Sequence, residues 1–315
     1  METAGASYDL TGVLHLVSGN ITMKRKQKTS VGIAVFLVAF VAGLLIYPAL
    51  CHSSHHNGLQ LVNAAAQNSS RNCLVVVTHG WIEKGDDWPQ DMAEAISSRI
   101  DANQWLCGYF DWSKGARTVN PADAAEYARD IAGIMLAGQI LKFNGHLKHI
   151  HLIGHSSGCW VISEAAKILA PQTKADIHLT FFDAYVPKSF SADTLGDVNV
   201  PADVNLWADH YYTRDYTGEP TAQDLTHAHN VDLTEIDQLI KDHNFPWKWY
   251  YATITGSFPK HSLMDNEKLV TDINGVDYGF ARSRGVADPN EWLHSLKLKM
   301  GDPAVKLRHQ PPNPP

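Results

Sequence analysis

The chain has 315 residues, of which 44% are apolar and 19% charged, a composition typical of a globular protein large enough for one substantial α/β domain. Its 26 Lys and Arg residues against 33 Asp and Glu residues give a net charge of −7, and no long basic stripe lies in the globular part, which argues against nucleic acid as a partner. Four cysteines are too few and too scattered for a disulfide framework or a cysteine-rich zinc site, although one bridge between Cys73 and Cys107 stays open.

A basic cluster followed by an apolar run marks the N-terminal part. Residues 24–28 carry the positive charges, and residues 29–51 are uncharged. Such a segment is either a secretory signal or an anchoring helix with its N-terminus in the cytoplasm, and its length fits both. We therefore expect an exported domain, either membrane-anchored through residues 23–51 or periplasmic or secreted after cleavage. Met23, directly before the cluster, makes residues 1–22 a candidate upstream extension of the reading frame.

Three further segments organise the rest of the chain. Residues 52–71 are small and polar and are predicted to form a linker with at most one short strand. Residues 72–309 form the predicted folded domain. The proline-rich residues 310–315 are predicted to be a disordered tail.

Within the folded domain, strand patterns alternate with helix patterns. The predicted strands are residues 73–78, 104–111, 147–153, 176–182, 204–212 and 228–234. The predicted helices are residues 90–101, 120–144, 158–169, 245–255 and 290–300. This alternation predicts an α/β fold with a mostly parallel sheet of about six strands and helices on both faces, preceded by the N-terminal apolar helix. A sheet of this kind places its functional groups at the carboxyl ends of its strands.

The motif G-x-S-x-G lies between a predicted strand and a predicted helix. Gly154 and Gly158 let the strand and the helix approach closely, while the central Ser156 sits on a strained turn with its hydroxyl exposed. At a strand-to-helix junction, this motif is typical of a serine nucleophile. A purely structural turn is the alternative.

A serine hydroxyl is a poor nucleophile at neutral pH, so it requires a base within hydrogen-bond reach and an acid that orients the base. Asp183 follows the strand after the motif, and His243 follows the last short strand, so the sheet can bring both near Ser156. Asp209 and Asp215 are alternatives for the acid, and His229 and His261 are alternatives for the base.

The oxyanion that forms on attack requires two preorganised N–H donors. The amide of Ser157, the residue after the nucleophile, is the first predicted donor. The amide of Trp81, in the loop after the first strong strand, is the second. His79 in the same loop is interpreted as a residue that shapes the loop rather than as a base.

Four stretches together resemble a known superfamily: HGW at residues 79–81, GHSSG at 154–158, FFDA at 181–184 and DHNFPWKWYYATI at 242–254. They resemble the α/β-hydrolase fold, and most of all its pancreatic-lipase-type branch. In that branch the acid directly follows the strand after the nucleophile, and the histidine precedes a helix that bears aromatic residues. The resemblance covers about residues 73–254 and implies the triad Ser156, Asp183 and His243.

The chain departs from that branch in two respects, because it lacks a disulfide-closed lid loop before His243 and a lipid-binding β-sandwich after it. The resemblance implies a serine hydrolase that cleaves carboxylic esters, with short or medium acyl chains or a lipid-like ester as substrate, through an acyl-enzyme. It implies no metal or organic cofactor, and membrane contact only through an uncleaved N-terminal segment. Acyl transfer and thioester or amide cleavage are alternatives on the same site, and a catalytically silent exported binding protein is the non-enzymatic alternative.

Overall fold

The structure, a computed structural model, describes residues 58–63, 71–83, 85, 87–143, 147–214, 221, 223–236, 243–259, 267–270, 279–280, 296–297 and 306–309. The chain divides into two units, Met1–His55 and His56–Pro315, and every described residue belongs to the second. The predicted extension, the N-terminal apolar segment and the tail therefore lie outside the described residues. None of the described helices has the length and apolar character that a membrane span requires.

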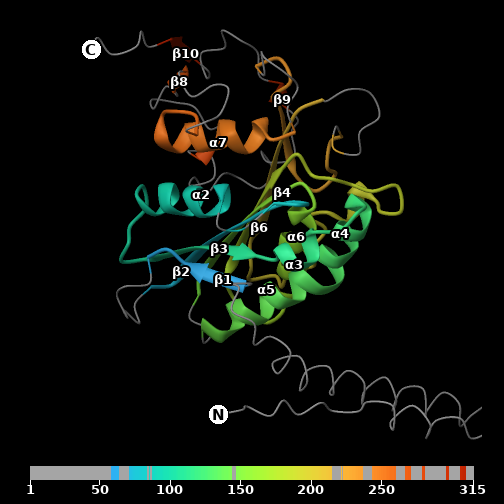
Figure 1. Cartoon of the computed structure of the whole chain (residues 1–315). Helices are drawn as coiled ribbons and strands as arrows, with labels where there is room; N and C mark the ends of the chain where they lie inside the picture. Colours follow the sequence, from blue (N-terminus) through green and yellow to red (C-terminus); the bar gives the residue numbers. More distant parts are fainter. Residues whose placement is uncertain are drawn as a thin grey trace, which may run out of the picture. The chain divides into compact units, whose positions relative to one another are not determined.

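A mostly parallel sheet forms the centre of the second unit (Figure 1). Eight described strands follow one another across it in the order β1-β3-β2-β4-β5-β6-β7-β9, and only β1 runs antiparallel to its neighbour. Their bounds are β1 Gly58–Leu61, β2 Cys73–Thr78, β3 Trp105–Asp111, β4 His149–His155, β5 Asp176–Phe182, β6 Leu206–Tyr212, β7 His229–Asp232 and β9 Leu296–Lys297. A separate antiparallel pair consists of β8, Glu267–Val270, and β10, Lys306–His309. The predicted mostly parallel sheet is confirmed.

Helices cover both faces of this sheet, as the sequence predicts (Figure 1). On one face lie α2, Trp88–Ser97, and α7, Phe245–Thr255. On the other lie α4, Pro121–Tyr127, α5, Gly133–Ile140, and α6, Gly158–Leu169. The short elements are α3 Ser113–Ala116, a π-helical turn Ala128–Ala132 between α4 and α5, and the 3-10 turns Leu141–Phe143 and Ala192–Thr194.

The apolar run of β2 shows why the sheet is buried on both sides. Leu74 and Val76 belong to the core cluster under α4, α5 and α6, whereas Val75 and Val77 belong to the cluster under α2 and α7. Successive side chains of a strand point to opposite faces, so a strand that packs against an apolar cluster on each face is apolar at successive positions. This pattern makes β2 easy to recognise from sequence.

The sheet is wider than the predicted six strands because two short strands extend its edges. β1 lies within the stretch predicted as a linker and pairs with β3. β9 occupies Leu296–Lys297, where the sequence predicts a helix over residues 290–300, and that prediction is wrong for these two residues. β9 pairs with Val231 and Asp232 of β7, so pairing with an open sheet edge outweighs the local helical pattern.

The cysteines Cys73, Cys107 and Cys159 are free thiols, so the bridge between Cys73 and Cys107 is not formed. In the parallel pair of β2 and β3, Cys73 lies opposite Trp105, and Cys107 lies opposite Val75. An offset of two residues between adjacent strands separates the two Cα atoms by ~8 Å, beyond the ~7 Å that a disulfide spans.

A buried polar cluster lies on the sheet face that α2 and α7 cover. The rings of His151 and His178 stack with their centroids 3.8 Å apart. The Thr180 hydroxyl donates to Oδ1 of Asp209 at 2.6 Å, and the Tyr211 hydroxyl donates to Oδ2 at 3.0 Å. Burial lowers the pKa of His151 and of His178 well below the usual value. Because of the hydrogen bonds from Thr180 and Tyr211, both oxygens of the Asp209 carboxylate accept a hydrogen bond within this buried cluster.

Candidate active site

The carboxyl ends of β4 and β5 bring Ser156 and Asp183 to the same edge of the sheet. The two strands are parallel, and their last residues, His155 and Phe182, lie opposite each other. Ser156 and Asp183 each come one residue later in the chain. The Ser156 amide donates to the Phe182 carbonyl at 2.9 Å and fixes the start of the turn. This edge is where parallel α/β sheets place their functional groups.

Backbone strain gathers at this edge. Among the described residues that are not glycine, the positive φ angles are those of Ile82 at 64°, Ser156 at 54° and Asp183 at 44°. A conformation of this kind costs about 1–3 kcal/mol per residue and persists only where the surrounding structure enforces it. The strained turn that the G-x-S-x-G motif predicts is present at Ser156.

Two glycines bring the loop after β2 directly against this turn. A Cβ atom on Gly158 would lie 2.3 Å from the His79 carbonyl oxygen, and one on Gly80 would lie 2.8 Å from Cβ of Ser156. His79 shapes the loop, because its Nδ1 donates to the Gly80 carbonyl at 2.9 Å and its own carbonyl accepts from Trp112 Nε1 at 2.9 Å. The loop that carries Trp81 therefore contacts the serine turn.

The predicted oxyanion donors occupy the two sides of this contact. Ser157 is the N-cap residue of α6, so its amide lies at the positive end of that helix. The indole Nε1 of Trp81 donates to the Thr118 carbonyl at 2.9 Å, and the Ile82 amide donates to the Ala116 carbonyl at 3.1 Å, which anchors the loop. Within the part of the chain that the structure describes, neither the Trp81 amide nor the Ser157 amide donates to a backbone carbonyl.

A short hydrogen bond joins the predicted acid and base. His243 Nδ1 donates to Asp183 Oδ2 at 2.6 Å, and the Thr213 amide donates to Asp183 Oδ1 at 3.1 Å. Asp183 is fully buried, whereas the His243 side chain is 34% exposed. Burial raises the pKa of Asp183 above its ordinary value, although the hydrogen bonds from His243 and Thr213 oppose the rise. The pair holds the partly exposed imidazole of His243 in one orientation.

The alternative acid and the alternative base that the structure describes, Asp209 and His229, lie elsewhere. Asp209 is engaged in the buried cluster with Thr180 and Tyr211. His229 is buried in β7, opposite Asp209 in the strand register. The other two candidates, Asp215 and His261, lie outside the described residues. Of the candidates that the structure describes, only Asp183 and His243 form a hydrogen-bonded pair at the edge that holds Ser156.

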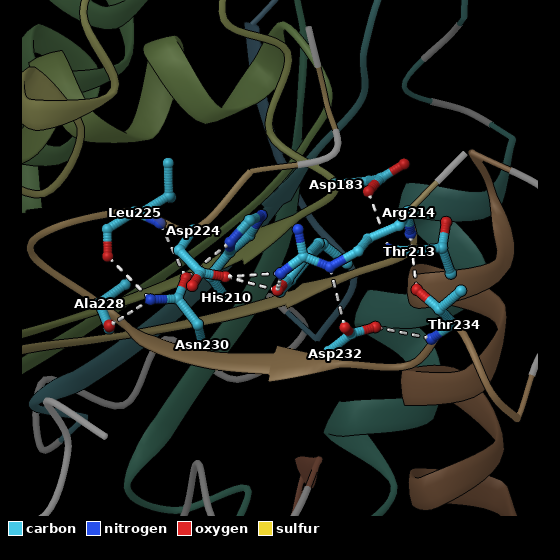
Figure 2. A network of polar contacts seen from close by, with 11 residues as sticks. Asp183, His210, Thr213, Arg214, Asp224, Leu225, Ala228, Asn230, Asp232 and Thr234 are labelled. Atoms are coloured by element: carbon cyan, nitrogen blue, oxygen red, sulfur yellow. Dashed lines mark hydrogen bonds and ion pairs between the residues drawn. The ribbon is translucent and has the colours of Figure 1, made fainter. Parts of the chain in front are cut away.

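A polar network supports the segment that presents Thr213 to Asp183 (Figure 2). Arg214 Nε donates to Asp232 Oδ2 at 3.1 Å, and the Arg214 amide donates to the Thr234 hydroxyl at 2.7 Å. The Thr234 amide in turn donates to Asp232 Oδ1 at 2.9 Å. These contacts connect the end of β6 to the end of β7. They support Thr213, which follows β6 and donates to Asp183, the residue after β5.

A second carboxylate–imidazole pair, which the sequence does not predict, lies beside the first. Glu83 Oε2 accepts from the Gly80 amide at 2.6 Å and lies 3.1 Å from His155 Nδ1. His155 Nε2 lies 3.1 Å from the carbonyl oxygen of His243. The only signal in the sequence is the histidine at the second position of the G-x-S-x-G motif, and it does not point to Glu83. Among the residues described, no three or more His, Cys, Asp or Glu side chains are arranged to hold a metal ion.

The fold and the site together fit the α/β-hydrolase class: a mostly parallel sheet covered on both faces, with a strained serine between β4 and α6. A family model described as Lipase matches residues 48–178. Pancreatic lipase-related protein 2 of Sus scrofa is 32% identical over 97 residues, which make up 30% of this chain and 20% of that protein. Inactive pancreatic lipase-related protein 1 of Mus musculus is 34% identical over 94 residues, 28% of this chain and 19% of that protein. The chain is thus related to the lipase-type α/β-hydrolases.

A solved structure titled for two metagenome-derived lipolytic enzymes, LipS and LipT, covers 63% of this chain and 97% of its own, with 12% identity and a TM-score of 0.35. The matched part of the chain spans about a fifth of the length of the curated relatives. The family match includes Trp81, Ser156 and Ser157 but ends before Asp183 and His243. One relative is described as inactive, so similarity over this part is compatible with an active and with an inactive protein, and the candidate acid and base lie beyond it.

Proposed function

We propose that this protein is a lipase-like serine hydrolase of carboxylic esters. One observation carries the proposal: His243 Nδ1 donates to Asp183 Oδ2 at 2.6 Å, at the sheet edge where Ser156 sits on its strained turn. The nucleophile Ser156, the orienting acid Asp183 and the base His243 then follow one another in the chain order that α/β-hydrolases use.

In the proposed reaction, Ser156 Oγ attacks the ester carbonyl carbon while His243 Nε2 takes the hydroxyl proton. Asp183 holds Nδ1–H and stabilises the imidazolium that forms. The amides of Trp81 and Ser157 donate to the oxyanion. The carbon–oxygen bond to the alcohol then breaks, and His243 returns the proton to the leaving oxygen. A water molecule, deprotonated by His243, attacks the acyl-enzyme carbonyl. The bond to Ser156 Oγ then breaks, His243 returns the proton to Oγ, and the carboxylic acid leaves.

The substrate class is proposed as esters with short or medium acyl chains. Only residues 233–242 separate β7 from His243, which leaves little chain for a lid over the site. The test is a panel of p-nitrophenyl esters from acetate to palmitate, with a thioester and an anilide of the preferred acyl group. We expect kcat/KM to peak at short or medium esters, and the anilide to be the poorest substrate.

The rate of hydrolysis of a long-chain triglyceride, measured below and above its solubility limit, tests this proposal. Because the segment before His243 is short, the rate should show no jump as the triglyceride passes its solubility limit. A sharp activation there would contradict the acyl-length proposal and leave ester hydrolysis standing. A higher rate of acyl transfer to an added alcohol than to water, or preference for the thioester, would favour the alternative chemistries of the same site.

We also propose that the folded domain is exported, because a basic cluster precedes an uncharged apolar run in residues 23–51. N-terminal sequencing of the natural protein should find a chain that begins at His52, or a membrane fraction in which the apolar segment is intact. Recovery of the uncleaved chain in the cytosolic soluble fraction would contradict both forms of this proposal.

A further inference from the structure

Glu83 links the loop after β2 to the serine turn. One carboxylate oxygen, Oε2, accepts from the Gly80 amide at 2.6 Å and faces His155 Nδ1 at 3.1 Å. Gly80 directly precedes Trp81, the proposed oxyanion donor, and His155 directly precedes Ser156. Burial raises the pKa of Glu83, but the charge and hydrogen bond of His155, together with the Gly80 amide, outweigh this effect and lower the pKa to about 2. The carboxylate is therefore ionised at neutral pH.

His155 continues this link to the base. Its Nε2 lies 3.1 Å from the His243 carbonyl oxygen, and its ring centroid lies 4.6 Å from that of His243. Trp88 of α2 packs edge-on against the His155 ring, with centroids 5.8 Å apart. Both ring nitrogens of His155 therefore face oxygen acceptors, the Glu83 carboxylate at Nδ1 and the His243 carbonyl at Nε2.

We propose that Glu83 and His155 act as one positioning unit, which holds the loop of Gly80 and Trp81 and the backbone of His243 in the geometry that ester hydrolysis requires. The proposal rests on the proposed function. One carboxylate oxygen fixes the loop, and one imidazole fixes the backbone that carries the base. Neither residue contacts the substrate's reacting atoms in this role.

The charge of Glu83 has a second consequence. When His243 takes the serine proton it becomes cationic, and the ring of His155 lies beside it. The Glu83 carboxylate lies 3.1 Å from Nδ1 of that ring. A nearby negative charge favours the cationic form of an imidazole, so Glu83 favours the proton transfer to His243.

The test compares Glu83→Gln, His155→Phe and the double variant. Gln keeps the size of Glu83 without the charge, and Phe keeps an aromatic ring at position 155 without either hydrogen bond. Each single change is expected to lower kcat for a short ester about 10- to 100-fold, since small misplacements of catalytic groups cost about that much. KM should change less than about twofold, because ground-state contacts to the substrate are kept. The double variant should be no slower than the slower single variant, because the two residues act together.

Three controls keep the outcomes separate. Glu94→Gln changes an exposed glutamate of α2 whose side chain bonds to Gln90, and it should leave kcat unchanged. Titration of Ser156 with a fluorophosphonate counts the competent sites, so kcat refers to folded protein even where a variant folds poorly. Glu83→Asp keeps the charge, but its carboxylate is one methylene too short to reach both partners, so an intermediate loss of kcat is expected.

Losses that multiply in the double variant, or unchanged kcat in Glu83→Gln, would overturn the positioning unit. A readout independent of activity is the NMR shift of the Gly80 amide proton, which donates to Glu83. This resonance should move in His155→Phe as well as in Glu83→Gln if the two residues form one unit, and an unmoved resonance in His155→Phe contradicts it. Absence of ester hydrolysis in the unchanged protein would instead refute the proposed function, while the Gly80 resonance still tests the link.

Discussion

Ser156→Ala should lower kcat for ester hydrolysis by at least about 10⁴-fold and leave the fold intact, because removing the nucleophile disables a triad that works as one unit. The matched control is Ser157→Ala at the adjacent position. The Ser157 hydroxyl is buried and has no hydrogen-bond partner within the described part of the chain, and its proposed contribution is a backbone amide that alanine keeps. The control should therefore retain kcat within about threefold of the unchanged protein.

The comparison of these two variants assigns the nucleophile within the pair of adjacent serines. Far-ultraviolet circular dichroism and thermal unfolding should show the same fold in both. Loss of activity in Ser157→Ala with activity retained in Ser156→Ala would identify Ser157, and not Ser156, as the nucleophile.

Asp183→Asn should lower kcat by about 10⁴-fold, because an amide at this position no longer holds the histidine tautomer or stabilises the imidazolium. The carboxylate now accepts from His243 Nδ1 and from the Thr213 amide. Asp209→Asn is the matched change on the next strand, where the carboxylate accepts from Thr180 and Tyr211 instead. It should keep kcat per competent site and lower the free energy of unfolding by about 1–3 kcal/mol, the usual cost of disturbing a buried hydrogen-bond network.

Fluorophosphonate titration again supplies the number of competent sites for both aspartate variants, and chemical denaturation supplies the unfolding free energy. Near-normal kcat in Asp183→Asn together with a collapse in Asp209→Asn would move the acid to the neighbouring strand. It would also weaken the resemblance to the pancreatic-lipase-type branch, in which the acid directly follows the strand after the nucleophile.

Some strands can be predicted from the residues of the strand alone. β2 and β5 begin and end where the sequence predicts. β2 is recognised by its continuous apolar run, because both of its faces pack against apolar clusters. The residues of β9 have a helical pattern of their own, and they form a strand by pairing with β7, which lies more than sixty residues earlier in the chain. Pairing across such a distance leaves no signal in a short window of sequence.

In the candidate site, too, some residues can be predicted from a local motif and others only from the structure. The G-x-S-x-G motif is only five residues long, and it predicts the strained backbone conformation that Ser156 adopts. The choice between Asp183 and Asp209 requires the position of His243 in space, which the strand order alone leaves open. Glu83 and His155 lie 72 residues apart and meet only because the loop after β2 packs against the serine turn, so no motif could reveal them.

Covalent labelling of the whole protein with a fluorophosphonate, followed by mass spectrometry of its peptides, tests the central claim most directly. The reagent phosphonylates a serine that has an activated hydroxyl and an oxyanion site. We expect one adduct, on Ser156, formed rapidly in the unchanged protein, absent in Ser156→Ala and formed far more slowly in His243→Gln. A protein that remains unlabelled, or one labelled at a serine other than Ser156, would contradict the central claim.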